Sequence, residues 1–483
     1  MTDLLYELLE QARVVQDLNE YLDRNEQGDA ELFALLMKDK VLYDHSEKQW
    51  YLWQGTYWAP DKTGKVYLFV SNDVAASYLS NAQKDCMDGD KKGEDRFVRR
   101  ARELRSRRRA NDVLNWATNL PGLALDGTEW DLSPLLLPVS NGLIDLRTGG
   151  IREALPSDRI RSMVPTEWQG IHCPAPLWER TISEIFNRDE QLISFIQRLF
   201  GYAITGETKE QKLPIFWGLG ANGKSTLVDT VSAVLGDDIC FTTQTDSLMD
   251  TKFGEGNAPR PFVYASRNKR LIWASESKEG RQLNTALVKQ LTGDGKITVR
   301  TLHSFPITFR QTYKIFLITN HCPILSDSDD IAIWRRVLRV PFNWRFVDDP
   351  RLPNELRRDK DIGQKLKEEY PGILAWLVRG CLEWQKQGLN PPPSVIESTE
   401  KYRASEDLIG QFFEECLAIG ENFDEAAGAV YKGYQKWCEE NGNNALSSRA
   451  FGQRMTRRFG ESVTKWKDGK SQRSYQGLKL NVH

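Results

Sequence analysis

The stretch from Gly218 to Thr226, GLGANGKST, is the part of the sequence best suited to chemistry. It follows an apolar run and leads into an amphipathic segment, so a strand, a glycine loop and a helix are expected in that order. Glycines let backbone N–H groups converge on phosphate oxygens, and the helix N-terminus adds partial positive charge. We expect nucleotide contacts from Gly218, Gly220, Ala221, Asn222, Gly223, Lys224, Ser225 and Thr226. The expected cofactors are ATP and Mg²⁺, with Lys224 on the β- and γ-phosphates and the Ser225 hydroxyl on the metal.

Three further motifs supply the other groups that ATP hydrolysis needs. KRLIWASES is a short apolar strand ending at Glu276, whose carboxylate could activate water and, with Ser225, hold Mg²⁺. KIFLITN ends at Asn320, a polar tip suited to orienting water against the γ-phosphate. DIAIWRRVLRVPF places Arg335 and Arg336 before another apolar strand, and one of them suits an arginine finger. Each motif alone is common, but together and in this order they indicate an ATPase.

Length and composition bound the architecture and the location. A chain of 483 residues, 40 % of them hydrophobic, is long enough for two to four domains with real cores. Its seven scattered cysteines include no CxxC pair, which disfavours a zinc ribbon and fits a reducing cytoplasm, bacterial or host. No run of 18 apolar residues is present, so no contact with a membrane is expected. The N-terminal 22 residues resemble an acidic amphipathic helix rather than a signal peptide.

The pattern along the chain predicts five parts. They are an N-terminal α+β domain (1–115), a mostly helical domain (116–205), an α/β nucleotide-binding core (206–345), a helical connector (346–404) and a small C-terminal domain (405–483). Trp50, Trp53 and Trp58 around Gly55 predict a small meander or hairpin. The segment 96–109 carries eight arginines; a DNA-facing helix and a solvated helix or linker remain open for it.

The C-terminal part has the pattern of a winged helix. A helix ends near Asn441, Ser447 or Ser448 can cap a second one, and two strands follow around the turn Asp468-Gly469. Residues 431–483 carry 11 Lys and Arg against four Asp and Glu, whereas the whole chain has a net charge of −2. The second helix presents Arg449, Arg454, Arg457 and Arg458 on its polar side. We expect these arginines to contact DNA; a domain for protein contacts is the alternative.

These motifs resemble the superfamily 3 helicases. More narrowly, FIQRLFGYAITGETKEQKLPIFWGLGANGKST, LTGDGKITVRTLHSFPITF and FLITNHCPIL with DIAIWRRVLRVPF are similar to the helicase half of phage and plasmid primase-helicases related to the poxvirus one. The resemblance is strong from about 195 to 345 and looser on either side. It implies an AAA+ fold, a hexameric ring and 3′-to-5′ tracking on single-stranded DNA.

The resemblance also assigns roles to single residues. Glu276 matches the catalytic acid, Asn320 the sensor, and Arg336 a finger acting across a subunit boundary, with Arg335 in reserve. A pore hairpin would fall within Asp294 to Tyr313, and Arg300 and His303 are its expected DNA contacts, although both could be structural. Two departures stand out. Ser275 replaces the metal-binding Asp found in many P-loop ATPases, and no primase half is evident, so a separate primase or polymerase is an expected partner.

Two classes of function remain open. The leading hypothesis is a hexameric replicative helicase of a phage, plasmid or other mobile element, acting on single-stranded and forked DNA. The alternative is a DNA-binding ATPase switch or initiator that does not unwind processively. A non-enzymatic initiator is disfavoured by the intact set of motifs, and a small-molecule kinase has no use for the hairpin, the finger or the basic tail.

Overall fold

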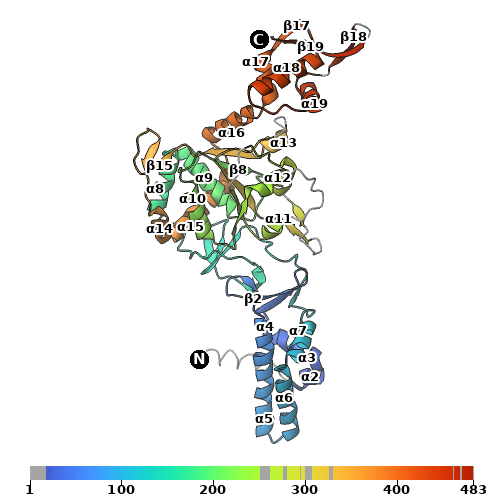
Figure 1. Cartoon of the computed structure of the whole chain (residues 1–483). Coiled ribbons are helices and arrows are strands. Elements are labelled where there is room, and N and C mark those ends of the chain that lie inside the picture. Colours follow the sequence, from blue (N-terminus) through green and yellow to red (C-terminus); the bar gives the residue numbers. More distant parts are fainter. Residues whose placement is uncertain are drawn as a thin grey trace.

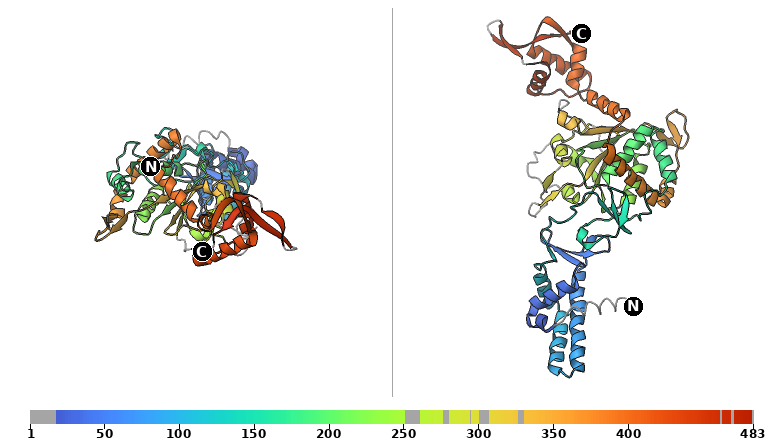
Figure 2. Two further views of the ribbon diagram at one scale, coloured as in Figure 1. Left: turned by 90° about the horizontal axis from the view of Figure 1, so that it is seen from above. Right: turned by 180° about the vertical axis from the view of Figure 1, so that it is seen from behind.

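The computed structural model describes residues 18–250, 261–275, 280–293, 295–299, 307–325, 330–460, 462–467 and 470–481. The chain is elongated, with a helical N-terminal part, a wide central part and a small C-terminal part in succession (Figure 1). The view from behind shows the same succession of parts (Figure 2, right). No helix among these residues is long and apolar enough to cross a bilayer.

The N-terminal part is a helical bundle joined to a small sheet. Its helices are α2 (Leu18–Asp23), α3 (Asn25–Leu36), α4 (Lys65–Leu68), the π-helix η1 (Phe69–Val74), α5 (Ala75–Met87), α6 (Lys91–Leu104) and α7 (Arg107–Ala117). The sheet has the order β3-β2-β1-β4, from β1 (Val41–Asp44), β2 (Gln49–Trp53), β3 (Trp58–Pro60) and β4 (Ala124–Leu125). Strands β1, β2 and β3 are antiparallel, which confirms the meander predicted around the tryptophans.

The arginine-rich segment 96–109 is divided between buried and exposed roles. Arg100 and Arg109, from α6 and α7, donate to the two carboxylate oxygens of fully buried Asp29 at 2.9 and 2.7 Å. The Tyr78 hydroxyl also donates to Asp29, at 2.8 Å. A buried carboxylate is tolerated because two guanidinium groups and a hydroxyl replace its hydration. The solvated-helix interpretation is therefore wrong for these two arginines, which hold α3, α6 and α7 together.

The central part is built on a five-stranded parallel sheet. Its strands are β8 (Leu213–Trp217), β9 (Cys240–Gln244), β10 (Leu271–Ser275), β13 (Lys314–Thr319) and β14 (Val337–Pro341), in the order β14-β8-β13-β10-β9. Before it come the antiparallel sheet of β5 (Leu136–Val139), β6 (Gly142–Asp145) and β7 (Gly150–Arg152), then helices α8 (Pro176–Ile185) and α9 (Glu190–Ala203). The carboxyl ends of β8, β10 and β13 meet at one edge of the sheet, where they can form a site.

Helices cover both faces of this sheet. On one face Phe200 of α9 stacks on Phe316 of β13, with Phe216 and Trp273 beside them and α10 (Lys224–Leu235) alongside. On the other lie α11 (Pro261–Ala265), α12 (Thr285–Leu291) and α13 (Ile331–Trp334), with a second apolar core. The apolar strands, buried on both sides, explain why the sequence shows continuous rather than alternating hydrophobic runs.

The predicted boundaries inside the central part do not separate hydrophobic cores. One buried cluster runs from Leu137 to Val395 and includes α9, the sheet and α15 (Tyr370–Gln387). Residues 116–205 contain β4 to β7 as well as helices, and α15 packs along α9 instead of bridging two domains. The prediction of a separate connector for 346–404 is therefore wrong for α15, because its apolar side chains complete the core of the sheet.

The C-terminal part has its own core and topology. Helices α17 (Leu408–Cys416), α18 (Ala427–Glu440) and α19 (Ser448–Phe459) pack on a three-stranded antiparallel sheet of order β17-β19-β18. Its strands are β17 (Leu417–Ala426), β18 (Val463–Lys467) and β19 (Lys470–Leu480). The side chain of Ser447 accepts a hydrogen bond from the Ala450 N–H and so caps α19, as the sequence predicts. Helix α16 (Pro393–Ser405) joins this part to the central one.

The Asp29 network yields a test of the N-terminal bundle. Asp29→Asn should destabilise α3, α6 and α7 by about 3 kcal/mol, because it removes the buried carboxylate that Arg100 and Arg109 share and leaves them only the more exposed Glu103 and Glu26. Hydrogen exchange of these helices, followed by mass spectrometry, measures the change. Asp23→Asn is the matched control, since Asp23 pairs with Arg96 at an exposed site. Equal protection in the two variants would contradict the structural role given to Asp29.

Candidate active site

The glycine loop between β8 and α10 has the backbone that the sequence predicts. Gly220, Ala221 and Gly223 have positive φ angles of 98°, 50° and 82°. A Cβ on Gly218 would lie 2.1 Å from the Asn222 side-chain nitrogen, and one on Gly223 would lie 2.6 Å from Ile185. Glycine is thus required at 218 by close packing and at 223 by both packing and a left-handed conformation. Ser225 and Thr226 follow in the first turn of α10, so the loop opens at a helix N-terminus.

Lys224 is the centre of the hydrogen bonds at this loop. Its ammonium donates to the Gly218 carbonyl at 2.6 Å, to Asn222 Oδ1 at 3.0 Å and to Asn320 Oδ1 at 3.2 Å. The residue is 6 % exposed, and burial lowers its pKa to about 8. These three acceptors are neutral oxygens, and no carboxylate among the described residues pairs with the ammonium. A buried cation held in this way has a strong affinity for an anion that reaches it.

Two neighbouring strands fix the other groups at the same edge. Asn320 follows β13 directly, and β13 is hydrogen-bonded to β8, which brings its amide to Lys224. The Asn222 side chain donates to the Phe342 carbonyl at 3.2 Å, and the Phe346 N–H donates to the Ala221 carbonyl at 2.6 Å. The segment after β14 therefore closes against the loop. The structure brings together the predicted phosphate loop and the predicted sensor.

The predicted acid and metal ligands are placed only in part. Ser275 ends β10, which is hydrogen-bonded to β13, at the edge of the sheet where Asn320 lies. Glu276 itself lies outside the described residues. Among the described residues, no group of three His, Cys, Asp or Glu could hold a metal ion. The loop fits a nucleotide phosphate, since Lys224 faces it with neutral partners only; Mg²⁺ would then be shared between that phosphate and the exposed Ser225 hydroxyl.

The two arginines lie at the opposite edge of the sheet. They precede β14, whose first residue, Val337, is paired with Leu213 at the start of β8. The length of β8 separates Leu213 from the loop at Gly218, which is about 16 Å at the usual rise per strand residue. Arg336 is buried and bound within its own chain, to Thr292 Oγ1 at 3.0 Å and the Ala332 carbonyl at 2.6 Å. Arg335 is exposed. Neither can reach the loop of its own chain, and Arg335 is the better placed to reach another copy.

The predicted DNA contacts are distributed over two places. Strands β11 (Lys296–Val299) and β12 (Ile307–Arg310) form the antiparallel hairpin expected between 294 and 313. Arg300 and His303 lie outside the described residues. In the C-terminal part, Arg449, Arg454, Arg457 and Arg458 all lie on α19. Arg458 pairs with Asp407 at the start of α17, which makes it a structural as well as a surface group.

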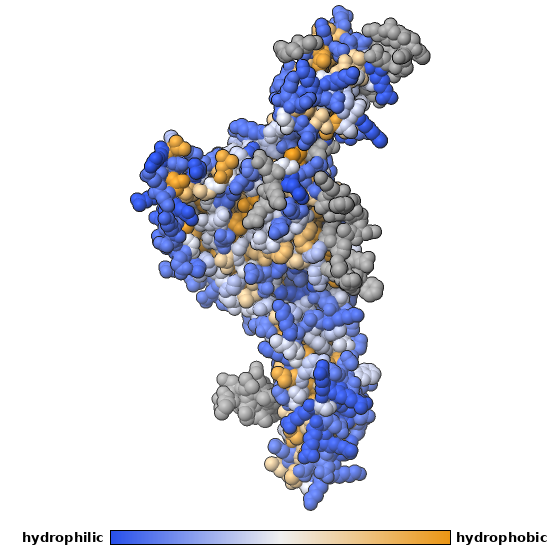
Figure 3. Space-filling view, viewed as in Figure 1, coloured by the Kyte–Doolittle hydropathy of each residue, from blue (hydrophilic) through white to orange (hydrophobic). Residues whose placement is uncertain are grey.

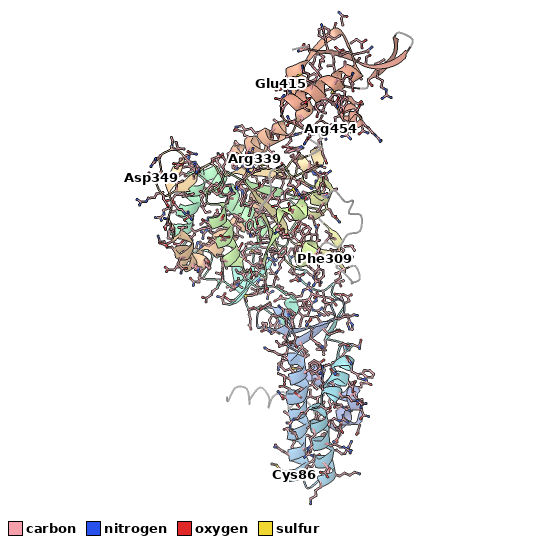
Figure 4. The ribbon with its side chains drawn as sticks, viewed as in Figure 1. Cys86, Phe309, Arg339, Asp349, Glu415 and Arg454 are labelled. Carbon is pink, nitrogen blue, oxygen red and sulfur yellow. The ribbon has the colours of Figure 1, made fainter. Side chains whose placement is uncertain are left out.

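Sequence reasoning missed the contacts that α16 makes with the strands beside the loop. The guanidinium of Arg339, on β14, lies 3.7 Å above the ring of Trp217, the residue before Gly218. The backbone N–H of Arg339 donates to the Thr399 hydroxyl of α16 at 2.9 Å. Tyr402 of α16 donates to the Pro323 carbonyl, just after Asn320. Figure 4 shows Arg339 at the boundary of the central part, with Arg454 beyond it in the C-terminal part. The pairing of Trp217 with Arg339 depends on strand order, so no signal in the sequence points to it.

Three segments of the chain match models of known families. Residues 30–187 match the model "D5 N terminal like", and residues 404–481 match "Poxvirus D5 protein-like". The segment between them that holds the loop, 216–336, matches a family of unknown function. The chain is therefore similar to D5-like proteins over two separate segments, one toward each end. The D5-like matches thus lie before and after the parallel sheet in the sequence.

Viral proteins are among the relatives of this D5-like chain. It is 25 % identical over 329 residues to a "Putative helicase" of Acanthamoeba polyphaga mimivirus, covering 64 % of this chain and 34 % of that protein. A "Putative helicase" of Frog virus 3 is 24 % identical, covering 71 % and 42 %. A "Putative primase" of African swine fever virus is 24 % identical, covering 50 % and 26 %. The chain therefore spans less than half the length of these relatives.

One solved structure aligns with most of the D5-like chain. It is the A-form apo structure of the NrS-1 C-terminal region, 11 % identical with a TM-score of 0.46, covering 92 % of this chain and 98 % of that one.

The lowered pKa of Lys224 predicts how nucleotide affinity depends on pH. The Lys224 amine must be protonated to hold a phosphate, and in the free protein it loses this proton as the pH rises through about 8. Nucleotide affinity, measured by calorimetry with a non-hydrolysable ATP analogue, should therefore fall about tenfold between pH 7 and pH 9. In Lys224→Met the remaining weak binding should lack this dependence. A flat profile in the unsubstituted protein would show that Lys224 does not meet the phosphate.

Proposed function

We propose that the D5-like chain is an ATP-dependent DNA helicase with a P-loop core of the AAA+ type. The observation that carries the proposal is Lys224, a buried cation bonded to neutral oxygens of the glycine loop and to the predicted sensor Asn320. The parallel sheet of order β14-β8-β13-β10-β9 supports it, because the loop lies on a central strand with the sensor strand beside it. The helicase names of the viral relatives point to the same activity.

The nucleotide contacts follow from the geometry of the loop. Backbone N–H groups of the loop and of the first turn of α10 would bind the phosphates, and Lys224 would exchange its carbonyl partners for the β- and γ-phosphate oxygens. Ser225 would ligate Mg²⁺, which neutralises charge on the phosphates when bound. Asn320 would orient the attacking water and Glu276 would accept its proton.

We further propose that the site is completed by a neighbouring copy in a ring, expected to be a hexamer. The two arginines lie across the sheet from their own loop, so a finger from this position acts in trans. Arg336 is buried in hydrogen bonds of its own chain, whereas Arg335 is exposed. We therefore reverse the order expected from the family resemblance, with Arg335 as the finger and Arg336 as the residue that fixes its position.

The C-terminal part is proposed to bind DNA as a winged helix. Its order of helix, strand, two helices and a strand pair, with β19 between β17 and β18, is the order that a winged helix requires. The arginines of α19 occupy the helix that would face the duplex. Thr399 and Tyr402 of α16 contact Arg339 of β14 and the Pro323 carbonyl, and these contacts connect this part with the strands that carry the nucleotide site. Forked DNA and a separate primase or polymerase are the proposed partners.

Strand displacement on forked DNA tests the function. With ATP and Mg²⁺, a substrate bearing only a 3′ tail should be unwound and one bearing only a 5′ tail should not, while Lys224→Ala unwinds neither. The polarity follows from the family resemblance, and the loss follows from the phosphate contact of Lys224. ATP hydrolysis that DNA stimulates, without displacement of either substrate, would favour the alternative function of a DNA-bound switch.

A further inference from the structure

The N-terminal bundle contains a groove that the proposed motor does not use. It lies between α4 with η1 on one side and the turn from α6 to α7 on the other, and has a volume of about 410 Å³. Its lining consists of Thr63, Gly64, Tyr67, Leu68, Ser71, Leu104, Arg105, Ser106, Arg107 and Ala110. Apolar side chains reach the surface among hydrophilic ones over this bundle (Figure 3). The groove thus combines apolar, hydroxyl and cationic groups.

The two arginines that line the groove form no ion pair with a described carboxylate. They are Arg105 and Arg107, and both are exposed. This distinguishes them from Arg100 and Arg109 of the same arginine-rich segment, which are bound to Asp29. Four more exposed cations lie nearby in the sequence, Lys62, Lys65, Arg102 and Arg108. Arg105 and Arg107 therefore give the groove a positive side that attracts an anion.

The floor of the groove offers a stacking surface. Tyr67 is 40 % exposed and Leu68 57 % exposed, although both belong to a helix whose Val66 is fully packed in the core. Exposed large apolar side chains beside arginines that pair with no described carboxylate are typical of a binding surface. Hydroxyl groups of Thr63, Ser71 and Ser106 add hydrogen-bonding capacity.

We propose that this groove binds single-stranded DNA, with a base stacked on Tyr67 and flanking phosphates on Arg105 and Arg107. Sequence-tolerant binding of single strands combines an aromatic platform with a cationic track, and both are present here. An acidic amphipathic helix is a poorer match, because its apolar face needs a row of apolar contacts over several turns. The lining exposes only Tyr67 and Leu68 as large apolar groups, among five hydroxyl or cationic ones.

The inference deepens the proposed function, since it takes DNA as the ligand, but it is tested without ATP. An oligothymidylate carrying 4-thiothymidine is crosslinked to the full chain, and the modified peptides are identified by mass spectrometry. Crosslinks within 62–71 or 104–110 are expected. Crosslinks confined to other parts of the chain would overturn the groove but not the helicase, whereas no binding to DNA at all would contradict both.

Substitutions separate the groove from the other contacts. Arg105→Ala with Arg107→Ala should weaken binding of a labelled oligothymidylate about tenfold and lower its salt dependence by about two phosphate contacts. Tyr67→Ala should abolish the groove crosslink, and Tyr67→Phe should retain it. Arg99→Ala is the control, because Arg99 is an exposed arginine of α6 that does not line the groove. Unchanged DNA affinity in the arginine variant, together with its loss of binding to a polyglutamate peptide, would assign the groove to an acidic protein instead.

Discussion

The structure depends most on the placement of one buried cation at the edge of a parallel sheet. Lys224 is held by the Gly218 carbonyl, the Asn222 amide and the Asn320 amide, so the glycine loop and the end of β13 must meet correctly before its charge is tolerated. Strand β8 delivers the loop, β13 delivers Asn320, and the segment after β14 binds Asn222 and Ala221. Burial lowers the pKa of Lys224 to about 8, and a bound phosphate would supply the counter-charge that no described residue provides.

The same sheet connects this site with more distant parts of the chain. Arg339, on β14, contacts the Trp217 ring next to the loop and the backbone of α16, and Tyr402 of α16 reaches the carbonyl of Pro323 beyond the sensor strand. Glu406, just after α16, accepts the N–H of Leu325 at 2.8 Å, and burial raises the pKa of its carboxyl group. A shift of the sensor strand on loss of the γ-phosphate would therefore be passed to α16 and the C-terminal part.

Much of this arrangement was accessible from the sequence, because its signals are local. The glycine loop, the strand ending at Asn320, the tryptophan meander and the Ser447 cap each depend on residues close together in the chain. What the sequence could not provide comes from packing between distant segments. Arg100 and Arg109 look like any basic helix until α3 brings Asp29 between them. Likewise, burial against Thr292 distinguishes Arg336 from Arg335, and the packing of α15 on α9 removes the predicted connector boundary.

The central claim is that a neighbouring copy completes the ATP site, and mixing two inactive variants tests it most directly. Lys224→Ala lacks the phosphate contact and Arg335→Ala lacks the finger, so each alone should have no ATPase activity. When they are mixed at equal amounts and allowed to exchange subunits, about one interface in four would pair an intact loop with an intact Arg335, and activity should return. The account predicts that recovery. Mixed rings that stay inactive, or an Arg335→Ala protein that hydrolyses ATP normally, would contradict it.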